Sequence, residues 1–82
     1  MKKIRFLPNV PAEVRAIPQH EAMSILKALH RYIETGHGKV KPLSGDLEGL
    51  LRLRVGNYRV LFDETADTVT LHGVRDRKDA YQ

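Results

Sequence analysis

Hydrophobic residues in this chain first recur with the period of an α-helix and later with the period of a β-strand. Between residues 19 and 36 the apolar side chains form one stripe at helical spacing, and Gly36 is a typical helix end. The stripe consists of Ala22, Ile25, Leu26, Leu29 and Ile33. This pattern predicts a long amphipathic helix that buries the stripe against the rest of the protein.

A strand and a shorter helix are predicted before this long helix. Residues 2–7 alternate sufficiently for a strand, with Ile4 and Phe6 on one face. Residues 9–18 begin with Asn9, a good helix cap, and include a proline suited to the first helical turn and another that closes the segment. We therefore expect a strand followed by a pair of helices.

The second half of the chain has the period of strands. Residues 37–49 contain four Gly or Pro residues and predict a loop. Residues 51–62, "LRLRVGNYRVLF", alternate around Gly56-Asn57, which can supply the positive φ angles of a two-residue turn. This hairpin pairs Val55 with Tyr58, Arg54 with Arg59, Leu53 with Val60 and Arg52 with Leu61. After a looser turn, residues 69–74 predict a further strand.

The predicted order is β-α-α-β-β-β, which indicates an α+β fold with the helical pair packed on one face of a small antiparallel sheet. The length, 82 residues, predicts a single domain spanning residues 1–82. The absence of cysteine excludes disulfides, zinc ribbons and thiol nucleophiles. No segment has the roughly 20 apolar residues that span a bilayer, so we expect a cytoplasmic protein without a membrane partner.

Charge is unevenly distributed along the chain, whose formal net charge is +4. The hairpin carries Arg52, Arg54 and Arg59 without any acid, and the next five residues, "DETAD", carry three acids. The predicted register places the three arginines on one face, although like charges opposite each other destabilise a sheet. Guanidinium groups bind phosphate oxygens in pairs, so the face indicates an anion site, most naturally for a nucleic-acid backbone.

Two other interpretations of the arginine face stay open. The arginines can extend into solvent or pair with distant acids such as Asp76 or Asp79, because charged residues are common on the outer face of a sheet. An acidic or C-terminal peptide segment would suit the same charges.

A second basic cluster lies at the end of the sequence and contains Arg75, Arg77, Lys78 and Tyr81. If the last strand lies beside the hairpin, this cluster can bring a cation and an aromatic ring to the arginine face. That combination stacks a base beside a bound phosphate. The alternative is an ordinary frayed and charged terminus.

Histidine is the remaining candidate for acid–base chemistry. Of the four histidines, His72 lies on the predicted last strand, out of phase with Val69 and Leu71, where it can serve as a general acid or base. An ordinary strand histidine is the favoured interpretation. The histidines lack the cysteine or carboxylate neighbours that accompany a metal site, so no metal is expected.

Two stretches, "KPLSGDLEGLLRLRVGNYRVLF" and the terminal "VRDRKDAY", resemble toxins of the RelE/ParE superfamily, from type II toxin–antitoxin systems. The likeness to the RelE branch implies a RelE-like microbial RNase-type fold and a ribosome-dependent mRNA endoribonuclease (mRNA interferase) that needs no metal or other cofactor. A ribose 2′-hydroxyl would attack the adjacent phosphate in the A site. The resemblance implies catalytic roles for Arg59, Arg77 and Tyr81 and RNA binding by Arg52 and Arg54. Arg75 and Lys78, in the basic cluster at the end of the sequence, are further candidates for RNA binding.

The resemblance also implies partners and two rival functions. The partners are a cognate antitoxin that is acidic and partly disordered, the ribosome with its mRNA, and operator DNA only through the antitoxin complex. The rivals are a ParE-like toxin that poisons gyrase and a non-enzymatic, degenerate toxin that acts as a co-repressor. Some relatives have lysines where Arg52 and Arg54 stand, and arginine is a poor general base, so the base is unassigned.

Overall fold

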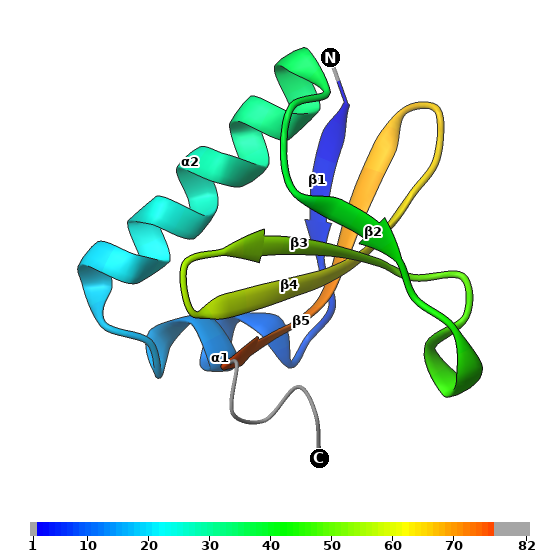
Figure 1. Cartoon of the computed structure of the whole chain (residues 1–82). Coiled ribbons are helices and arrows are strands. Elements are labelled where there is room, and N and C mark those ends of the chain that lie inside the picture. Colours follow the sequence, from blue (N-terminus) through cyan, green and yellow to red (C-terminus); the bar gives the residue numbers. More distant parts are fainter. Residues whose placement is uncertain (1, 77–82) are drawn as a thin grey trace.

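The computed structural model describes residues 2–76, which form two α-helices, a 3₁₀ turn and a five-stranded sheet (Figure 1). In chain order the elements are β1 (Lys3–Phe6), α1 (Val10–Arg15), α2 (Gln19–Thr35), β2 (Val40–Pro42), η1 (Gly45–Leu47), β3 (Leu51–Val55), β4 (Tyr58–Glu64) and β5 (Thr68–Asp76). The strands lie in the order β1-β5-β4-β3-β2. The predicted α+β class is confirmed.

The sheet differs from the prediction at its two edges. Strand β1 runs parallel to β5, whereas the other three pairings are antiparallel. Residues 37–49 were predicted as a loop, but β2 within them pairs with β3. Its three residues are too few to show a period, and Pro42 at its end suits an edge strand.

Helix α2 has the predicted length and end. Gly36 adopts the left-handed conformation, with a φ of 77°, and its N–H donates to the Tyr32 carbonyl. Ile25 and Leu29 are buried, as expected, but Leu26 is 38% exposed. Adjacent residues differ by roughly 100° around a helix, so a side chain next to Ile25 turns away from the sheet.

Both helices pack on the same face of the sheet and enclose one hydrophobic core. The buried apolar residues are Val10, Ile25, Leu29, Leu53, Val60, Phe62, Val69, Leu71 and Val74. At its centre Phe62 meets Tyr32 edge to face, with ring centroids 5.6 Å apart. The described helices leave the other face of the sheet uncovered, and we call it the open face.

A β-bulge in β5 determines which of its residues reach the open face. Leu61 pairs with Gly73 and Phe62 with Leu71, so His72 is an extra residue in β5. The buried apolar side chains of the strand are therefore those of Val69, Leu71 and Val74, which do not alternate strictly. Gly73 is buried as well. Because a bulge shifts the phase of a strand by one residue, both His72 and Arg75 lie on the open face.

Beyond the end of β1, two side chains form hydrogen bonds to the edge of β5. They are those of Asn9, which caps α1, and of Glu13 within α1. The side-chain amide of Asn9 donates to the His72 carbonyl at 3.0 Å, and Glu13 Oε1 accepts the Val74 N–H at 2.9 Å. Burial alone would raise the pKa of Glu13, but hydrogen bonds from Asn9, from the Val74 N–H and from Arg75 outweigh it and lower that pKa. The helix is thereby fixed to the bulged strand.

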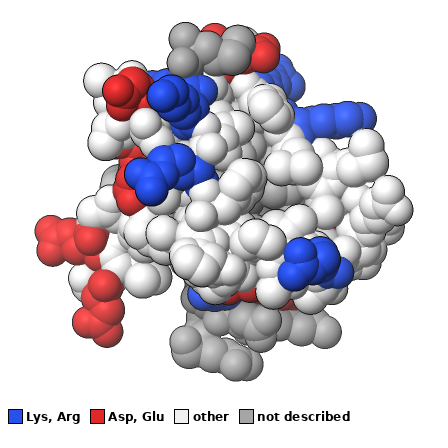
Figure 2. All heavy atoms as spheres, turned by 180° about the vertical axis from the view of Figure 1, so that it is seen from behind, with Lys and Arg blue, Asp and Glu red and all other residues white. Residues whose placement is uncertain are grey.

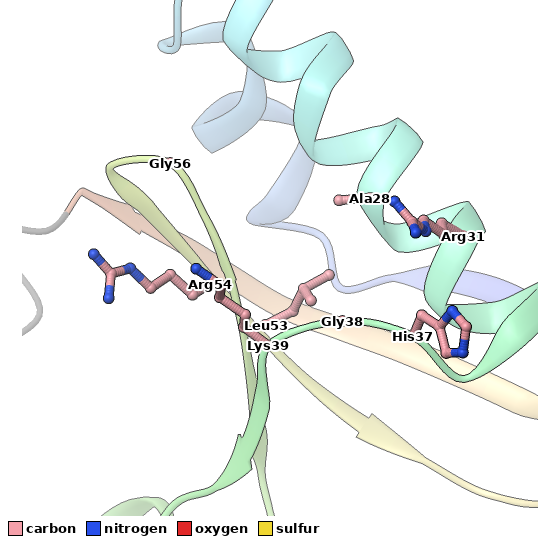
Figure 3. A pocket seen from close by; sticks show the side chains of 8 residues that line it. All are labelled: Ala28, Arg31, His37, Gly38, Lys39, Leu53, Arg54 and Gly56. Carbon is pink, nitrogen blue, oxygen red and sulfur yellow. The ribbon is translucent and has the colours of Figure 1, made fainter.

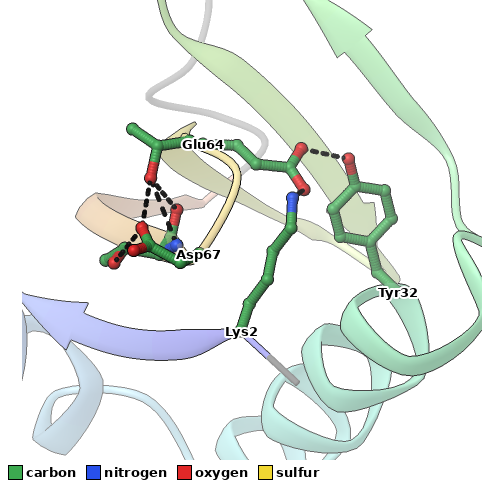
Figure 4. Close-up of polar contacts among 6 residues, drawn as sticks. Lys2, Tyr32, Glu64 and Asp67 are labelled. Atoms are coloured by element: carbon green, nitrogen blue, oxygen red, sulfur yellow. Dashed lines mark hydrogen bonds and ion pairs between the residues drawn. The ribbon is translucent and has the colours of Figure 1, made fainter.

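A second polar cluster joins α2 to the far end of β4. Lys2 and Tyr32 converge on the Glu64 carboxylate, with the Tyr32 hydroxyl donating at 2.7 Å (Figure 4). The hydrogen bond from Lys2 is the main cause that lowers the pKa of Glu64. Burial, followed by the hydrogen bond to Glu64, raises the pKa of Tyr32 to about 12.

The lowered pKa of Glu64 makes stability depend on pH in the acid range. A carboxyl whose pKa is lower in the folded state contributes stability that is complete above its ordinary pKa of 4.5 and lost as pH falls through the lowered value. Glu64→Gln should lower the free energy of unfolding by about 1 kcal/mol at pH 7. It should also make that free energy depend less on pH between pH 3 and pH 7, as measured by urea unfolding. The exposed Glu48→Gln is the control, and equal slopes in both variants would contradict the assignment.

Candidate nucleic-acid interface

The arginine hairpin forms with the predicted register. Arg54 pairs with Arg59, Leu53 with Val60, and Val55 with Tyr58. Gly56 alone supplies a positive φ, 57°, because no non-glycine residue among those described has one. A positive φ at the first central residue alone is typical of a type II′ hairpin turn, so Asn57 does not share this role.

A third arginine extends the hairpin pair across the sheet. Arg59 pairs with Arg75 of β5 on its other side, so Arg54, Arg59 and Arg75 follow one another across three strands. We call these residues the arginine row. Side chains opposite each other in a sheet have Cβ atoms about 5 Å apart, so the row concentrates positive charge against electrostatic repulsion.

The members of the row differ in exposure. Arg54 is exposed and Arg75 is partly exposed, but Arg59 in the middle is only 6% exposed. The prediction that all three hairpin arginines are displayed is therefore wrong for Arg59. Arg52 lies on β3 two residues before Arg54 and is partly exposed. Its buried Nε has no hydrogen-bond partner among residues 2–76.

Arg75 lies along its own strand and pairs with α1. Its Nη1 is 2.7 Å from Glu13 Oε1 and 3.1 Å from the Val74 carbonyl oxygen. The guanidinium lies over Gly73, since a Cβ built on that glycine would meet Nη1 at 2.7 Å. The acid that pairs with Arg75 is thus Glu13, 62 residues away in sequence, which strand spacing does not reveal.

The side chains of His72 and Asp63 are hydrogen-bonded to each other on the open face. His72 Nε2 lies 2.5 Å from Asp63 Oδ2 across β4 and β5. Asp63 was not singled out by the sequence analysis, and His72 was interpreted as an ordinary strand residue. The available signal was the spacing of Val69, Leu71 and Val74 around Gly73, because a glycine inside a strand often marks a bulge.

A cationic pocket of about 550 Å³ lies beside the arginine row, between α2 and β3. Ala28 and Leu53 provide its apolar part, and its lining contains no acid. Figure 3 shows the Arg54 guanidinium on one side of this pocket and the side chains of Arg31 and His37 on the other. We call this space the cationic pocket.

Apolar side chains are exposed elsewhere on the surface. Met23 and Leu26 line a groove of about 380 Å³ along α2, and they are 50% and 38% exposed. Phe6 on the edge strand β1 is 48% exposed, although its partner Leu71 is buried. Figure 2 shows a face of the molecule on which charged residues lie mainly toward the edges, with uncharged surface between them.

Three predicted site residues, Arg77, Lys78 and Tyr81, lie outside the described residues. Within residues 2–76 no group of three or more potential metal-ligating His, Asp or Glu side chains occurs. In the same part of the chain, neither helix has the length and apolar character needed to cross a membrane.

The sheet, its helical pair and the hairpin together define the RelE-like fold. A chain of the RelBE2 toxin–antitoxin complex from Mycobacterium tuberculosis matches with a TM-score of 0.75 and 24% identity, over 93% of this chain and 98% of that chain. A chain of the RelB–RelE complex from Methanococcus jannaschii matches with a TM-score of 0.75 and 22% identity, over 94% of each chain. A point mutant of YafQ from E. coli matches with a TM-score of 0.79 and 10% identity over both whole chains.

The predicted resemblance to the RelE/ParE superfamily is thus confirmed as a structural match over nearly the whole chain. No protein-family model and no curated protein matches the sequence.

Gly73→Ala tests the position of the Arg75 guanidinium. The new Cβ would come within 3.1 Å of three guanidinium atoms, so the flexible end of Arg75 must move away from Glu13 while the backbone stays in place. We expect the free energy of unfolding to fall by about 1 kcal/mol, through the lost charged hydrogen bond. In NMR spectra the Arg75 Nε–H and Val74 amide signals should shift. Unchanged Arg75 signals would contradict this placement.

Proposed function

We propose that this protein is the toxin of a type II toxin–antitoxin pair and that it cleaves mRNA in the ribosomal A site. The arginine row is the observation that supports this most directly. Three arginines on adjacent strands, with Arg52 nearby on β3, repel one another and so destabilise the sheet. Their guanidinium groups are suited to bind a phosphate backbone. The RelE-like fold, shared with the structures of toxin–antitoxin complexes described above, supports the same assignment.

The proposed reaction is attack of a ribose 2′-hydroxyl on the adjacent phosphate, which yields a 2′,3′-cyclic phosphate and a 5′-hydroxyl. Exposed Arg54 and partly exposed Arg52 would bind the phosphates. Arg59, buried at the centre of the row, would stabilise the negative charge that develops in the transition state. Exclusion of water around Arg59 would strengthen this electrostatic effect. Arg75 and Lys78 would bind the flanking backbone, while Arg77 would assist Arg59 and Tyr81 would orient the nucleotide.

An acidic antitoxin is the proposed protein partner. The structures from M. tuberculosis and M. jannaschii are both described as toxin–antitoxin complexes. The cationic pocket combines an apolar part with Arg31, His37, Lys39 and Arg54, which suits an acidic segment that carries an apolar anchor. The groove at Met23 and Leu26 suits the apolar side of a helix. Contact with operator DNA would be made through the antitoxin, and the toxin would act in the cytoplasm.

Arginine substitutions test the nuclease function directly. In a purified translation reaction on a defined mRNA, the wild type should cut only when ribosomes are present, at positions phased to A-site codons. Arg59→Ala should lower the cleavage rate about 10²–10³-fold, because a buried positive charge near the transition state is removed. Arg54→Ala, at an exposed position that tolerates truncation, should also reduce cleavage, whereas Arg15→Ala on α1 should not.

That assay, combined with a growth assay for toxicity and a DNA supercoiling assay, would identify the rival functions. Full toxicity of Arg59→Ala, with its fold intact by circular dichroism, would exclude the nuclease assignment. Intact mRNA together with inhibited DNA supercoiling would identify a gyrase poison. Intact mRNA with neither effect would leave a non-enzymatic binding protein that acts with its antitoxin.

Substitution in the cationic pocket tests the antitoxin site. Arg31→Glu reverses a charge on the pocket lining and should weaken antitoxin binding about tenfold, mainly by slowing association at low salt. Arg15→Glu makes the same change of net charge on exposed α1 and is the matched control. Binding kinetics with the antitoxin encoded beside this gene are the readout. Equal effects of the two variants would show that only overall charge matters.

A further inference from the structure

The arginine row provides no group that can move a proton. Arginine stays charged at all relevant pH values, so none of the row can take the proton of a 2′-hydroxyl. Glu13 is already occupied, since its carboxylate accepts hydrogen bonds from Asn9, from the Val74 N–H and from Arg75. Lys41, opposite Arg52, and Lys3 on β1 also belong to the open face. Among the described residues of this face, His72 is the histidine, and it is paired with Asp63.

The geometry of this pair is that of an oriented base. His72 Nε2 is 2.5 Å from Asp63 Oδ2, and the two side chains are 30% and 40% exposed. When Nε2 donates its hydrogen to the carboxylate, the lone pair of a neutral imidazole lies on Nδ1. Among residues 2–76 the structure records no partner for Nδ1. A histidine held by a carboxylate through one nitrogen and open at the other is the arrangement that accepts a proton in hydroxyl-activating sites.

The bulge brings the pair next to the arginine row. His72 immediately precedes Gly73, and the Arg75 guanidinium lies over that glycine. The residue that carries the imidazole and the glycine covered by the guanidinium are thus adjacent in β5. Half-buried Leu61 is the residue of β4 opposite Gly73 and offers an apolar surface there. A nucleotide bound over this part of the open face would lie between His72 and the Arg75 guanidinium.

The position of His72 is fixed at its ring and at its backbone. Asp63 holds its ring from β4, and the side chain of Asn9 donates to its backbone carbonyl from α1. Gly73 leaves space beside it for the Arg75 guanidinium. A histidine that served only to fill the strand would not need its ring and its backbone held separately.

We infer that His72 is the general base of the proposed reaction and that Asp63 is its positioning residue, an inference that rests on the proposed function. His72 Nδ1 takes the proton of the 2′-hydroxyl while the 2′-oxygen forms a bond to phosphorus. The bond from phosphorus to the 5′-oxygen breaks, and the leaving oxygen takes a proton from water. The imidazolium then returns its proton to solvent. No oxidant, reductant or further reactant is required.

Single-turnover cleavage on ribosomes programmed with one mRNA, measured from pH 5.5 to pH 8.5, tests this role. The wild-type rate should fall at low pH, as expected when a reaction depends on a general base, and His72→Gln should lower the maximum rate about 100-fold and abolish that fall. Free imidazole should partly restore cleavage by His72→Ala. The charged groups facing His72 are Asp63 on β4, Arg5 on β1, Arg75 on β5 and Glu13 on α1, so variants at those positions are not used as controls.

Four further measurements separate a base from a structural residue. Binding of mRNA with a 2′-deoxy A-site nucleotide should be unchanged in His72→Gln, and the exposed His20→Gln should cleave like the wild type. Asp63→Asn should lower the rate less than His72→Gln does and keep a pH-dependent rate. Thermal unfolding should show that all variants are folded.

The outcomes distinguish the role of His72 from the proposed function. Wild-type rates and an unchanged pH profile in His72→Gln would overturn the role of His72 and leave mRNA cleavage standing. A wild-type protein that cuts no mRNA on ribosomes would overturn the proposed function, and the role of His72 with it.

Discussion

The phase shift in β5 is the constraint on which the rest of this structure depends. Val69 and Leu71 bury their side chains on the helical face, and strict alternation would then bury Gly73 and Arg75 and expose Val74. The bulge at His72 restores Val74 to the core and turns Arg75 to the open face. A single additional residue thus completes the hydrophobic core and the arginine row together.

The concentration of charge on the open face is tolerated because the opposite face of the sheet is stabilised by the hydrophobic core. Apolar residues of three strands pack there against α1 and α2, and truncation of one such side chain typically costs about 2–5 kcal/mol. Contributions of that size exceed the repulsion between like charges in a cross-strand pair, which typically costs about 1 kcal/mol or less. Glu13 lowers the repulsion further by pairing with Arg75. The charge on one side is therefore tolerated through the packing on the other.

Local periodicity in the sequence predicted the long helix and the hairpin, although not the exposure of Leu26. The helical stripe gave the extent of α2, and alternation about Gly56 gave the hairpin register down to the pair of Arg54 and Arg59. Such patterns were insufficient where distant segments meet. The parallel pairing of β1, the contact of Glu13 with Arg75 and the hydrogen bond of Asp63 with His72 all depend on tertiary structure. The burial of Arg59 belongs to the same group, because alternation assigns a face of the sheet and says nothing of what covers it.

Glu13 carries a consequence for the thermodynamics of ligand binding. One oxygen of its carboxylate accepts both the Val74 N–H, which attaches α1 to the sheet, and the Arg75 guanidinium, which belongs to the open face. An anion that draws Arg75 away competes with this carboxylate and changes the free energy with which the helix is docked. By reciprocity, a protein that displaces α1 alters the affinity of Arg75 for anions by the same factor. Helix docking and anion binding are thus coupled equilibria that share one oxygen atom.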